Sequence, residues 1–261
     1  MQALATPHTN SLGGRIVVIT RPAGTASSLA RQVRARGGVP LSLPGLSLRG
    51  ADDPLTMRAA LAEALRDEVL VFTSPAAVRF AARLHPLRTA ATVLAVGQGT
   101  ARALRRLGIA ALAPARQDSE GLLEHPMLAN LQGRRVALIG APGGRGVLRE
   151  QLAARGAQLR ELHVYRRVAP RLLRRHVAAV EQLPASAMVL LSSADALDNL
   201  RKQLRPEALN RFFAATAITS SERLAEAARG AGFKQVRIAA SALSADLLAE
   251  AARYESSFTK A

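Results

Sequence analysis

The chain has 261 residues, a formal net charge of +17, nearly half apolar residues and no cysteine. The lack of cysteine excludes disulfides, thiolate nucleophiles and cysteine-ligated metal sites. The first ten residues lack the basic start and apolar core of a signal peptide, and no apolar run approaches the roughly 20 residues that cross a bilayer, so we expect a cytoplasmic protein without a membrane span.

Short apolar runs alternate along the chain with Ala-, Leu- and Arg-rich stretches of helical period. Continuous apolar strands are typical of parallel sheets that helices cover on both faces, so the alternation predicts a doubly wound α/β fold. In chain order, the predicted strands span residues 16–20, 39–43, 69–73, 93–96, 136–139, 159–165, 188–191, 215–219 and 236–239. The predicted helices span residues 26–36, 54–66, 75–84, 100–107, 121–130, 144–155, 171–182, 194–203, 206–213, 221–231 and 245–253. We expect residues 1–12 and 255–261 to be loose tails, and glycines 37, 108, 156 and 232 to end helices.

The first strand–helix unit recurs 119 residues later. The segment from Gly14-Arg15-Ile16 to Ala35-Arg36-Gly37 returns without a gap as the segment from Gly133-Arg134-Arg135 to Ala154-Arg155-Gly156. A chance match is the alternative in a chain rich in these residues, but helical period alone would not align the flanking strands and glycines. The repeat predicts two similar α/β lobes with a ligand-binding cleft between them.

After its stop glycine, each copy continues as a long extended segment, at residues 39–49 and 158–169. Two such segments at the same point of the repeat would let the chain cross from one lobe to the other and return. A contiguous division near Gly133 is the alternative.

Arginine supplies almost all of the positive charge, since lysine occurs only at positions 202, 234 and 260. The guanidinium fork pairs two-pronged with carboxylate or phosphate, and a chain this basic should attract polyanions. For any single arginine, a solvated helix face is the alternative interpretation.

Polar residues gather where predicted strands end and helices begin, which is where open α/β sheets place ligands. Free backbone N–H groups at helix N-termini bind carboxylate or phosphate, although ordinary N-capping requires the same residue types. The seven such ends together favour anion binding on a chain of this charge. The candidate binding residues at these ends are Arg21, Thr73, Ser74, Gly97, Thr100, Ser119, Gly143, Ser192, Ser193, Ser220 and Ser221.

Other motifs are incomplete. Arg102 stands where a dinucleotide fingerprint needs a small residue, residues 140–146 lack the Gly-Lys-Ser/Thr ending of a phosphate loop, and the five histidines show no metal spacing. With six Phe, two Tyr and no Trp, the chain offers few stacking platforms for nucleic acid.

Tyr165 is the one candidate for proton transfer. It precedes Arg166 and Arg167 on the second extended segment, where its phenol could donate a proton to a leaving hydroxyl. The alternative is a strand residue whose ring packs in the core.

Taken together, these residues resemble the uroporphyrinogen-III synthase family over about Arg15 to Ala252. The resemblance rests on Val18-Ile19-Thr20-Arg21-Pro22, Phe72-Thr73-Ser74-Pro75-Ala76-Ala77-Val78, Val96-Gly97-Gln98-Gly99-Thr100-Ala101, Ser119-Glu120-Gly121-Leu122 and Val164-Tyr165-Arg166. It implies two α/β lobes joined by a two-stranded linker. The first lobe would be residues 1–38 and 169–261, the second residues 50–157, and the linker strands residues 39–49 and 158–168.

The resemblance also implies the reaction. Linear hydroxymethylbilane, a substrate with eight carboxylates, would lose its terminal hydroxyl as water and close with inversion of its last pyrrole ring, without metal or organic cofactor. Tyr165 resembles the tyrosine that the family is proposed to use as the acid, and Thr73, Ser74, Thr100 and Ser193 resemble its substrate-lining hydroxyls. The sequence departs from the family at residues 220–224, which replace a Gly-x-Thr-Thr-Ala type of turn, and at Ala76, where some relatives are polar.

Two other functions fit parts of the sequence. A non-catalytic two-lobed protein that binds anions or small molecules would not need Tyr165, and a nucleic-acid-binding protein is supported by the charge alone. We expect a monomer that acts on a small polycarboxylate and binds neither nucleic acid nor membrane.

Overall fold

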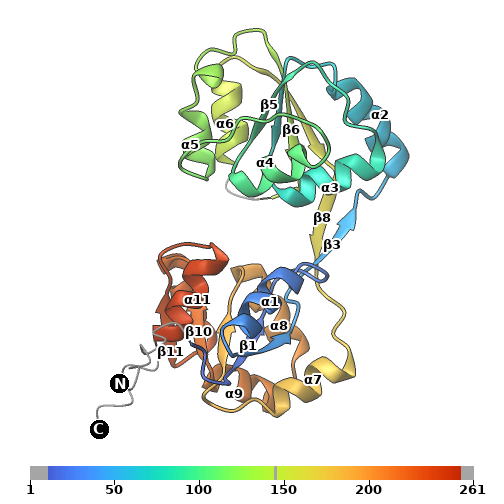
Figure 1. Cartoon of the computed structure of the whole chain (residues 1–261). Coiled ribbons are helices and arrows are strands. Elements are labelled where there is room, and N and C mark those ends of the chain that lie inside the picture. Colours follow the sequence, from blue (N-terminus) through green and yellow to red (C-terminus); the bar gives the residue numbers. More distant parts are fainter. Residues whose placement is uncertain (1–10, 144–145, 254–261) are drawn as a thin grey trace, which may run out of the picture. The chain divides into compact units, whose positions relative to one another are not determined.

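The computed structural model describes residues 11–143 and 146–253. The chain forms two compact units: unit 1 takes residues up to Ser47 and from Val168 onward, and unit 2 takes Leu48–Arg167 (Figure 1). The predicted tails at 1–10 and 255–261 and the predicted helix start at Gly144 lie outside the described residues. Each unit has its own sheet and its own core.

Unit 1 is built on a five-stranded parallel sheet with the strand order β11-β10-β9-β1-β2. Its strands are β1 (Ile16–Ile19), β2 (Val39–Ser42), β9 (Met188–Leu190), β10 (Thr216–Thr219) and β11 (Gln235–Ile238). Its helices are α1 (Ser27–Ala35), α7 (Arg174–Glu181), α8 (Ala194–Gln203), α9 (Pro206–Ala214), α10 (Glu222–Ala231) and α11 (Ser244–Ala252).

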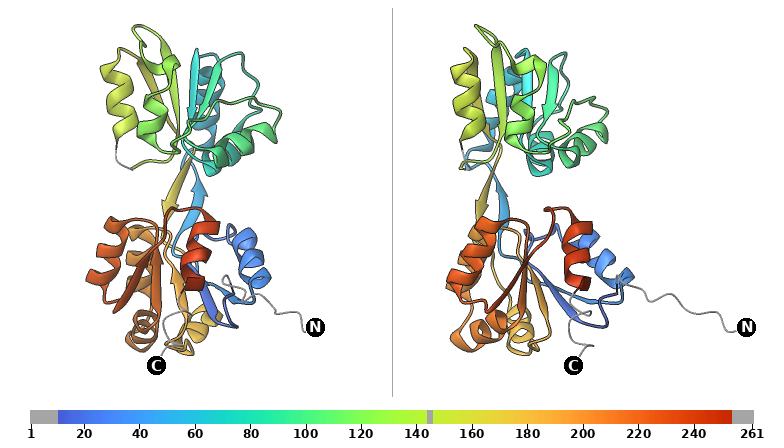
Figure 2. Two further views of the ribbon diagram at one scale, coloured as in Figure 1. Left: turned by 60° about the vertical axis from the view of Figure 1, so that its left-hand side comes forward. Right: turned by 90° about the vertical axis from the view of Figure 1, so that its left-hand side faces the viewer.

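Successive side chains of β1 point to opposite faces of this sheet, which gives unit 1 two cores. Val17 and Ile19 pack with α1 and α11, whereas Val18 packs with side chains of α7 to α10. Both faces are therefore covered by helices, as Figure 2 shows, and the predicted doubly wound arrangement is confirmed for this unit.

Unit 2 has a four-stranded parallel sheet with the order β5-β4-β6-β7. Its strands are β4 (Val69–Phe72), β5 (Thr92–Ala95), β6 (Arg135–Gly140) and β7 (Gln158–His163). Its helices are α2 (Pro54–Ala64), α3 (Pro75–Leu84), α4 (Gln98–Arg105), α5 (Ser119–Leu123), the 3₁₀ turn η1 (Pro126–Leu128) and α6 (Val147–Ala154). Leu70 and Phe72 of β4 pack with α2, α3 and α4, and Val69 and Val71 pack with α5, η1 and α6. This sheet is also covered on both faces.

The internal repeat is confirmed at the level of single hydrogen bonds. Leu12 N–H donates to Arg36 O at 2.8 Å, and Leu131 N–H, 119 residues later, donates to Arg155 O at 3.2 Å. The equivalent bonds Gly14 N–H to Gly37 O and Gly133 N–H to Gly156 O measure 2.8 and 3.0 Å. These bonds place β1-α1-β2 of unit 1 and β6-α6-β7 of unit 2 in the same local geometry. The four predicted stop glycines all have positive φ, between 73° and 123°.

The extended segments divide differently from the prediction. β2 belongs to the sheet of unit 1 and β7 to that of unit 2, so only β3 (Ser47–Gly50) and β8 (Tyr165–Val168) form the two-stranded sheet at which the chain passes between units. The predicted linker strands 39–49 and 158–168 and the single strand 159–165 were therefore too long. The first part of each segment is a strand of a sheet, because its apolar side chains pack against a neighbouring strand and a core. In the second segment β7 ends at His163, and Val164 separates it from β8.

Two further boundaries were wrong. Leu12, assigned to a tail, is fully buried in the core of unit 1. The predicted helix 121–130 is the short helix α5 followed by η1, because Pro126 has no N–H to continue an α-helix and disfavours helical geometry at His125.

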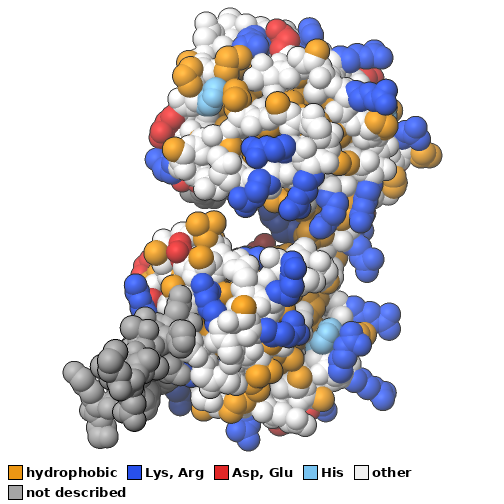
Figure 3. Space-filling view, in the orientation of Figure 1, with side chains coloured by type: hydrophobic (Ala, Val, Ile, Leu, Met, Phe, Trp, Pro, Cys, Tyr) orange, Lys and Arg blue, Asp and Glu red, His pale blue; other side chains and the backbone are white. Residues whose placement is uncertain are grey.

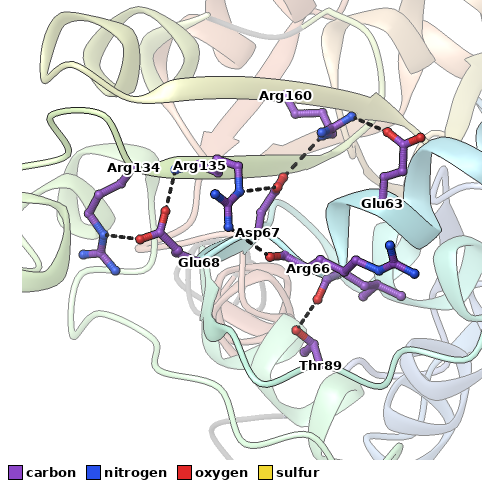
Figure 4. Close-up of polar contacts among 9 residues, drawn as sticks. Glu63, Arg66, Asp67, Glu68, Thr89, Arg134, Arg135 and Arg160 are labelled. Atoms are coloured by element: carbon purple, nitrogen blue, oxygen red, sulfur yellow. Dashed lines mark hydrogen bonds and ion pairs between the residues drawn. The ribbon is translucent and has the colours of Figure 1, made fainter.

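An ion-pair network joins the N-terminal ends of the strands of unit 2 (Figure 4). The side chain of Asp67 is 3% exposed and lies 3.5 Å from Arg135 Nε and 3.3 Å from Arg160 Nε. Arg160 also contacts Glu63 of α2 at 3.1 Å. The network therefore ties α2 and the start of β4 to β6 and β7.

Candidate active site

Unit 2 contains a cavity of about 340 Å³ at the opposite, C-terminal ends of its strands. It lies beside the ends of β4 and β6, the two central strands of the sheet. After β4 the chain continues to β5 on one side of this pair, and after β6 it continues to β7 on the other side. Such a reversal of strand order leaves a crevice in which open α/β sheets bind ligands. The lining residues are Thr73, Ser74, Val96, Ser119, Leu138, Gly140, Ala141, Gly143, Gly146, Val147, Leu148, Arg149, Glu161, His163, Tyr165 and Arg167.

Five of the predicted site residues meet in this cavity: Thr73, Ser74, Ser119, Gly143 and Tyr165. They come from four separate parts of the chain that the parallel sheet brings together at one edge.

Tyr165 is positioned by two contacts with α3. Its hydroxyl lies 3.1 Å from Ser74 Oγ, and its ring stacks on Phe80 with 5.4 Å between centroids and 12° between planes. Tyr165 is only 4% exposed, yet it lines the cavity. The ring therefore packs in the core of unit 2 and the residue also borders the cavity, while its role as a proton donor stays a prediction.

Ser74 is the N-cap of α3. Its Oγ accepts the N–H of Ala77 at 3.0 Å, and Pro75 occupies the first helical position, where its missing N–H costs nothing. The same helix then supplies Phe80, and the guanidinium carbons of Arg79 and Arg83 lie 5.3 and 5.4 Å from the Phe80 ring centroid. One short helix thus holds both the hydroxyl and the ring of Tyr165.

Gly140 allows Thr73 to sit at the strand junction. A Cβ at Gly140 would lie 2.5 Å from Thr73 Oγ1, which donates to Ile139 O at 3.3 Å. In unit 1 the equivalent hydroxyl, Ser192 Oγ, donates to Thr20 O at 3.0 Å. The repeat therefore preserves the hydrogen bond, while the residue that follows the acceptor carbonyl is Gly140 in unit 2 and Arg21 in unit 1.

Sequence reasoning missed a row of ionisable residues on the cavity wall. Glu161, His163, Tyr165 and Arg167 are spaced two residues apart along β7 and β8, and all four line the cavity. The two-residue period of a strand was the available signal, but the single long strand predicted there did not reveal which face meets the cavity.

The N-terminus of α6 also borders the cavity. Gly146 is its N-cap with φ of 70° and provides no side-chain acceptor, so the first N–H groups of this helix have no side-chain cap. Arg149 of the first turn lines the same cavity. Glu150 of the same turn pairs with Arg149 at 3.5 Å, so a substrate carboxylate would compete with this side chain for Arg149 and the helix end.

Two predicted residues of unit 2 do not line the cavity, and a third lies at a helix end that is already capped. Gly97 is the N-cap of α4 and Thr100 is buried within that helix, at 3% exposure, and neither lines the cavity. Ser119 does line it, but the helix is capped by Asp118, whose carboxylate accepts Gly121 N–H at 2.7 Å. A carboxylate of the protein therefore already accepts an N–H group at this helix end, and the role of Ser119 in substrate binding stays a prediction.

In unit 1, Arg21 is half-buried and its Nη2 donates to Ser244 Oγ at 3.1 Å. Burial lowers the pKa of its guanidinium. Ser192 is held by Thr20, because its N–H donates to Thr20 Oγ1 at 3.0 Å and its hydroxyl donates back to the backbone.

Two of the remaining serines are ordinary caps. Ser193 Oγ accepts Ala196 N–H at 3.1 Å at the start of α8, and Ser221 Oγ accepts Leu224 N–H at 3.4 Å at the start of α10. Ser220 lies half-buried beside Ser221. These residues belong to unit 1 and are not part of the cavity in unit 2.

Within residues 11–143 and 146–253, no helix has the length and apolar character that a membrane crossing requires. In the same residues, no group of three or more His, Asp and Glu side chains is arranged to hold a metal ion.

Comparison with known proteins assigns the chain to a family. A family model described as Uroporphyrinogen-III synthase HemD matches residues 27–249. The uroporphyrinogen-III synthase of Salmonella typhimurium strain LT2 is 30% identical over 238 residues, which cover 85% of this chain and 94% of that protein. The uroporphyrinogen-III synthase of Escherichia coli K12 is 29% identical over 232 residues, with the same two coverages.

Solved structures share the fold. A mutant uroporphyrinogen III synthase from Thermus thermophilus gives a TM-score of 0.57 at 20% identity, covering 90% of this chain and 96% of its own. A uroporphyrinogen-III synthetase from Helicobacter pylori 26695 gives 0.57 at 16% identity, covering 89% and 96%. At these identities the likeness concerns the fold, whereas the family match spans most of the sequence. The chain belongs to the uroporphyrinogen-III synthase family.

Proposed function

We propose that the protein cyclises hydroxymethylbilane to uroporphyrinogen III, with Tyr165 as the acid that assists loss of the terminal hydroxyl. Membership of the family supports the reaction. The contact between Tyr165 Oη and Ser74 Oγ inside a cavity supports the assignment of the acid.

The hydrogen bonds of Ser74 suit the role of Tyr165 as a proton donor. Ser74 Oγ already accepts from Ala77 N–H, so its own hydrogen is free to be donated to Tyr165 Oη. In that arrangement the phenolic proton points away from Ser74 and is available to the leaving hydroxyl. The same bond would stabilise the phenolate that remains, because hydrogen bonds to the charged form favour it.

The reaction returns the proton it consumes. Tyr165 protonates the leaving hydroxyl as the C–O bond breaks, and water departs. The new C–C bond forms at a pyrrole carbon, and one proton is released as the pyrrole ring regains its aromaticity. The tyrosinate can accept this proton, so the chain needs no external acid or base over one turnover.

The carboxylates of the substrate need cationic and N–H partners. In unit 2 we assign this role to Arg149, Arg167 and the first turn of α6, which line the same cavity as Tyr165. In unit 1 we assign it to Arg21, which forms no ion pair with a carboxylate of the described chain. Thr73, Gly143, Ser192, Ser193, Ser220 and Ser221 stay candidates for further substrate contacts.

The proposed partner is accordingly a small polycarboxylate, and we propose neither a nucleic-acid nor a membrane partner. We also propose that the protein is a cytoplasmic monomer. The non-catalytic binding protein is not favoured, because the relatives that match along most of the chain are named as synthases.

The test is a product assay. The purified protein receives enzymatically generated hydroxymethylbilane, the product is oxidised, and the type I and type III uroporphyrin isomers are separated by chromatography. We expect type III product from the wild type. Tyr165→Phe, which keeps the ring that stacks on Phe80, should lower kcat by about 10²-fold or more with little change in KM. Type I product alone, as in uncatalysed closure, would contradict the reaction, and full activity of Tyr165→Phe would contradict the acid.

A further inference from the structure

One continuous part of unit 2 contains no acidic residue. Between Val69 and Gln117 there is neither Asp nor Glu, although arginine occurs at positions 79, 83, 88, 102, 105, 106 and 116. This stretch includes β4, α3, β5 and α4. Residues 1–51 also contain neither Asp nor Glu, so the segment in unit 2 is one of two long stretches without an acidic residue.

The segment presents its arginines on one surface. α3 and α4 pack against each other on the same face of the sheet, and Arg79, Arg83, Arg102, Arg105 and Arg106 are all exposed. We call these five residues the α3–α4 basic face. Figure 3 shows basic side chains gathered over these two helices.

These arginines lack acidic partners. Among the described residues, none of the five forms an ion pair, whereas Arg135 and Arg160 share Asp67, Arg205 pairs with Glu181, and Arg229 pairs with Glu222. Five exposed guanidinium groups without counter-charges produce a positive potential that extends about a Debye length, roughly 8–10 Å at physiological salt.

The basic face adjoins the candidate active site. The N-cap of α3, Ser74, lies in the cavity wall, and Phe80 of α3 stacks on Tyr165. Arg79 and Arg83 lie against the same Phe80 ring. A polyanion bound over these helices would therefore lie near the cavity that Ser74 and Tyr165 line.

We propose that the α3–α4 basic face is a docking surface that captures the polycarboxylate substrate before it enters the cavity. This inference rests on the proposed function, which supplies a substrate with eight carboxylates. Positive potential of this kind raises association rates by roughly 10- to 10³-fold and acts on kcat/KM rather than on the chemical step. A nucleic acid is a poorer occupant, because the face offers no exposed aromatic ring on which bases could stack.

The test separates capture from chemistry. The variant Arg102→Gln/Arg105→Gln/Arg106→Gln removes three charges from α4 and leaves Arg79, Arg83 and the Phe80–Tyr165 contact intact. The matched control Arg171→Gln/Arg174→Gln/Arg175→Gln removes the same charge from exposed positions in unit 1 that also lack ion pairs among the described residues. Glutamine is close to arginine in helix propensity, and circular dichroism checks that both variants fold.

For each protein, kcat and kcat/KM are measured for type III product at ionic strengths from about 0.02 to 0.5 M. At the lowest salt we expect the α4 variant to lose about three- to tenfold in kcat/KM with unchanged kcat, and to show a shallower salt dependence than wild type. The control should stay close to wild type. Equal effects of the two variants, or a loss confined to kcat, would overturn the docking surface while wild-type type III product still upholds the proposed function. Type I product from the wild type would overturn both.

Discussion

Replacing Ser74 by alanine removes two interactions at once. The hydroxyl caps α3 by accepting Ala77 N–H at 3.0 Å, and it bonds Tyr165 Oη at 3.1 Å. Loss of a serine N-cap costs about 1 kcal/mol, and loss of a hydrogen bond costs about 0.5–1.5 kcal/mol. Because Tyr165 lines the cavity, water can reach its hydroxyl in the variant, which places the second loss at the lower end. We expect Ser74→Ala to lower the free energy of unfolding by about 1.5–2 kcal/mol.

The internal repeat provides a matched control. Ser193, 119 residues after Ser74, caps α8 by accepting Ala196 N–H at 3.1 Å, and no tyrosine contacts it among the described residues. Ser193→Ala therefore removes the cap alone and should cost about 1 kcal/mol. The difference between the two variants isolates the bond to Tyr165.

A double-mutant cycle measures that bond directly. Urea unfolding of Ser74→Ala, Tyr165→Phe and the double variant, followed by circular dichroism, should give a coupling energy of about 0.5–1 kcal/mol. The slope of the unfolding transition should be the same in all variants, since none changes the surface exposed on unfolding. Additive losses within about 0.3 kcal/mol, together with equal costs for the two serine variants, would refute the hydrogen bond on which the proposed proton geometry depends.

Three further predictions follow from other contacts. Phe80→Leu should lower kcat about tenfold with little change in KM, because it removes the ring that orients Tyr165, and Phe80→Tyr should restore most of the activity; equal rates for the two variants would contradict this positioning role. Asp67→Asn should lower the free energy of unfolding in urea by about 1–3 kcal/mol, because the buried carboxylate pairs with two arginines. Asp198→Asn, which removes an exposed pair, should lower it by less than about 0.5 kcal/mol. Similar urea midpoints for the two variants would show that the network of Figure 4 adds no stability. Burial and a neighbouring arginine lower the pKa of His176, so the unfolded chain binds its proton first and stability should fall as the pH drops below about 6.5. His176→Gln should reduce that fall between about pH 7.5 and 5.5, and an unchanged pH dependence would exclude His176 as its source.

Sequence patterns determined the architecture of each unit. Strand and helix positions follow from the local period of apolar residues, and the repetition of the Gly14 segment at Gly133 predicts two similar sheets. The stop glycines and the caps at Ser74 and Ser193 could likewise be predicted from the sequence, because residues within one turn of a helix end determine where the helix ends. The resemblance of short motifs in a fixed order indicated the family.

Tertiary structure decided what those elements do. The extended segments share a pattern with ordinary strands, so only pairing showed that β2 and β7 belong to the two sheets and that β3 and β8 alone form the separate ladder. Tyr165 meets Ser74 across 91 positions of sequence, and its partner Phe80 carries no sequence signal that distinguishes it from any other core residue. Local propensity and period are properties of neighbouring residues, whereas a cavity and a hydrogen bond between distant segments depend on the volumes and directions of side chains that only the folded sheet brings together.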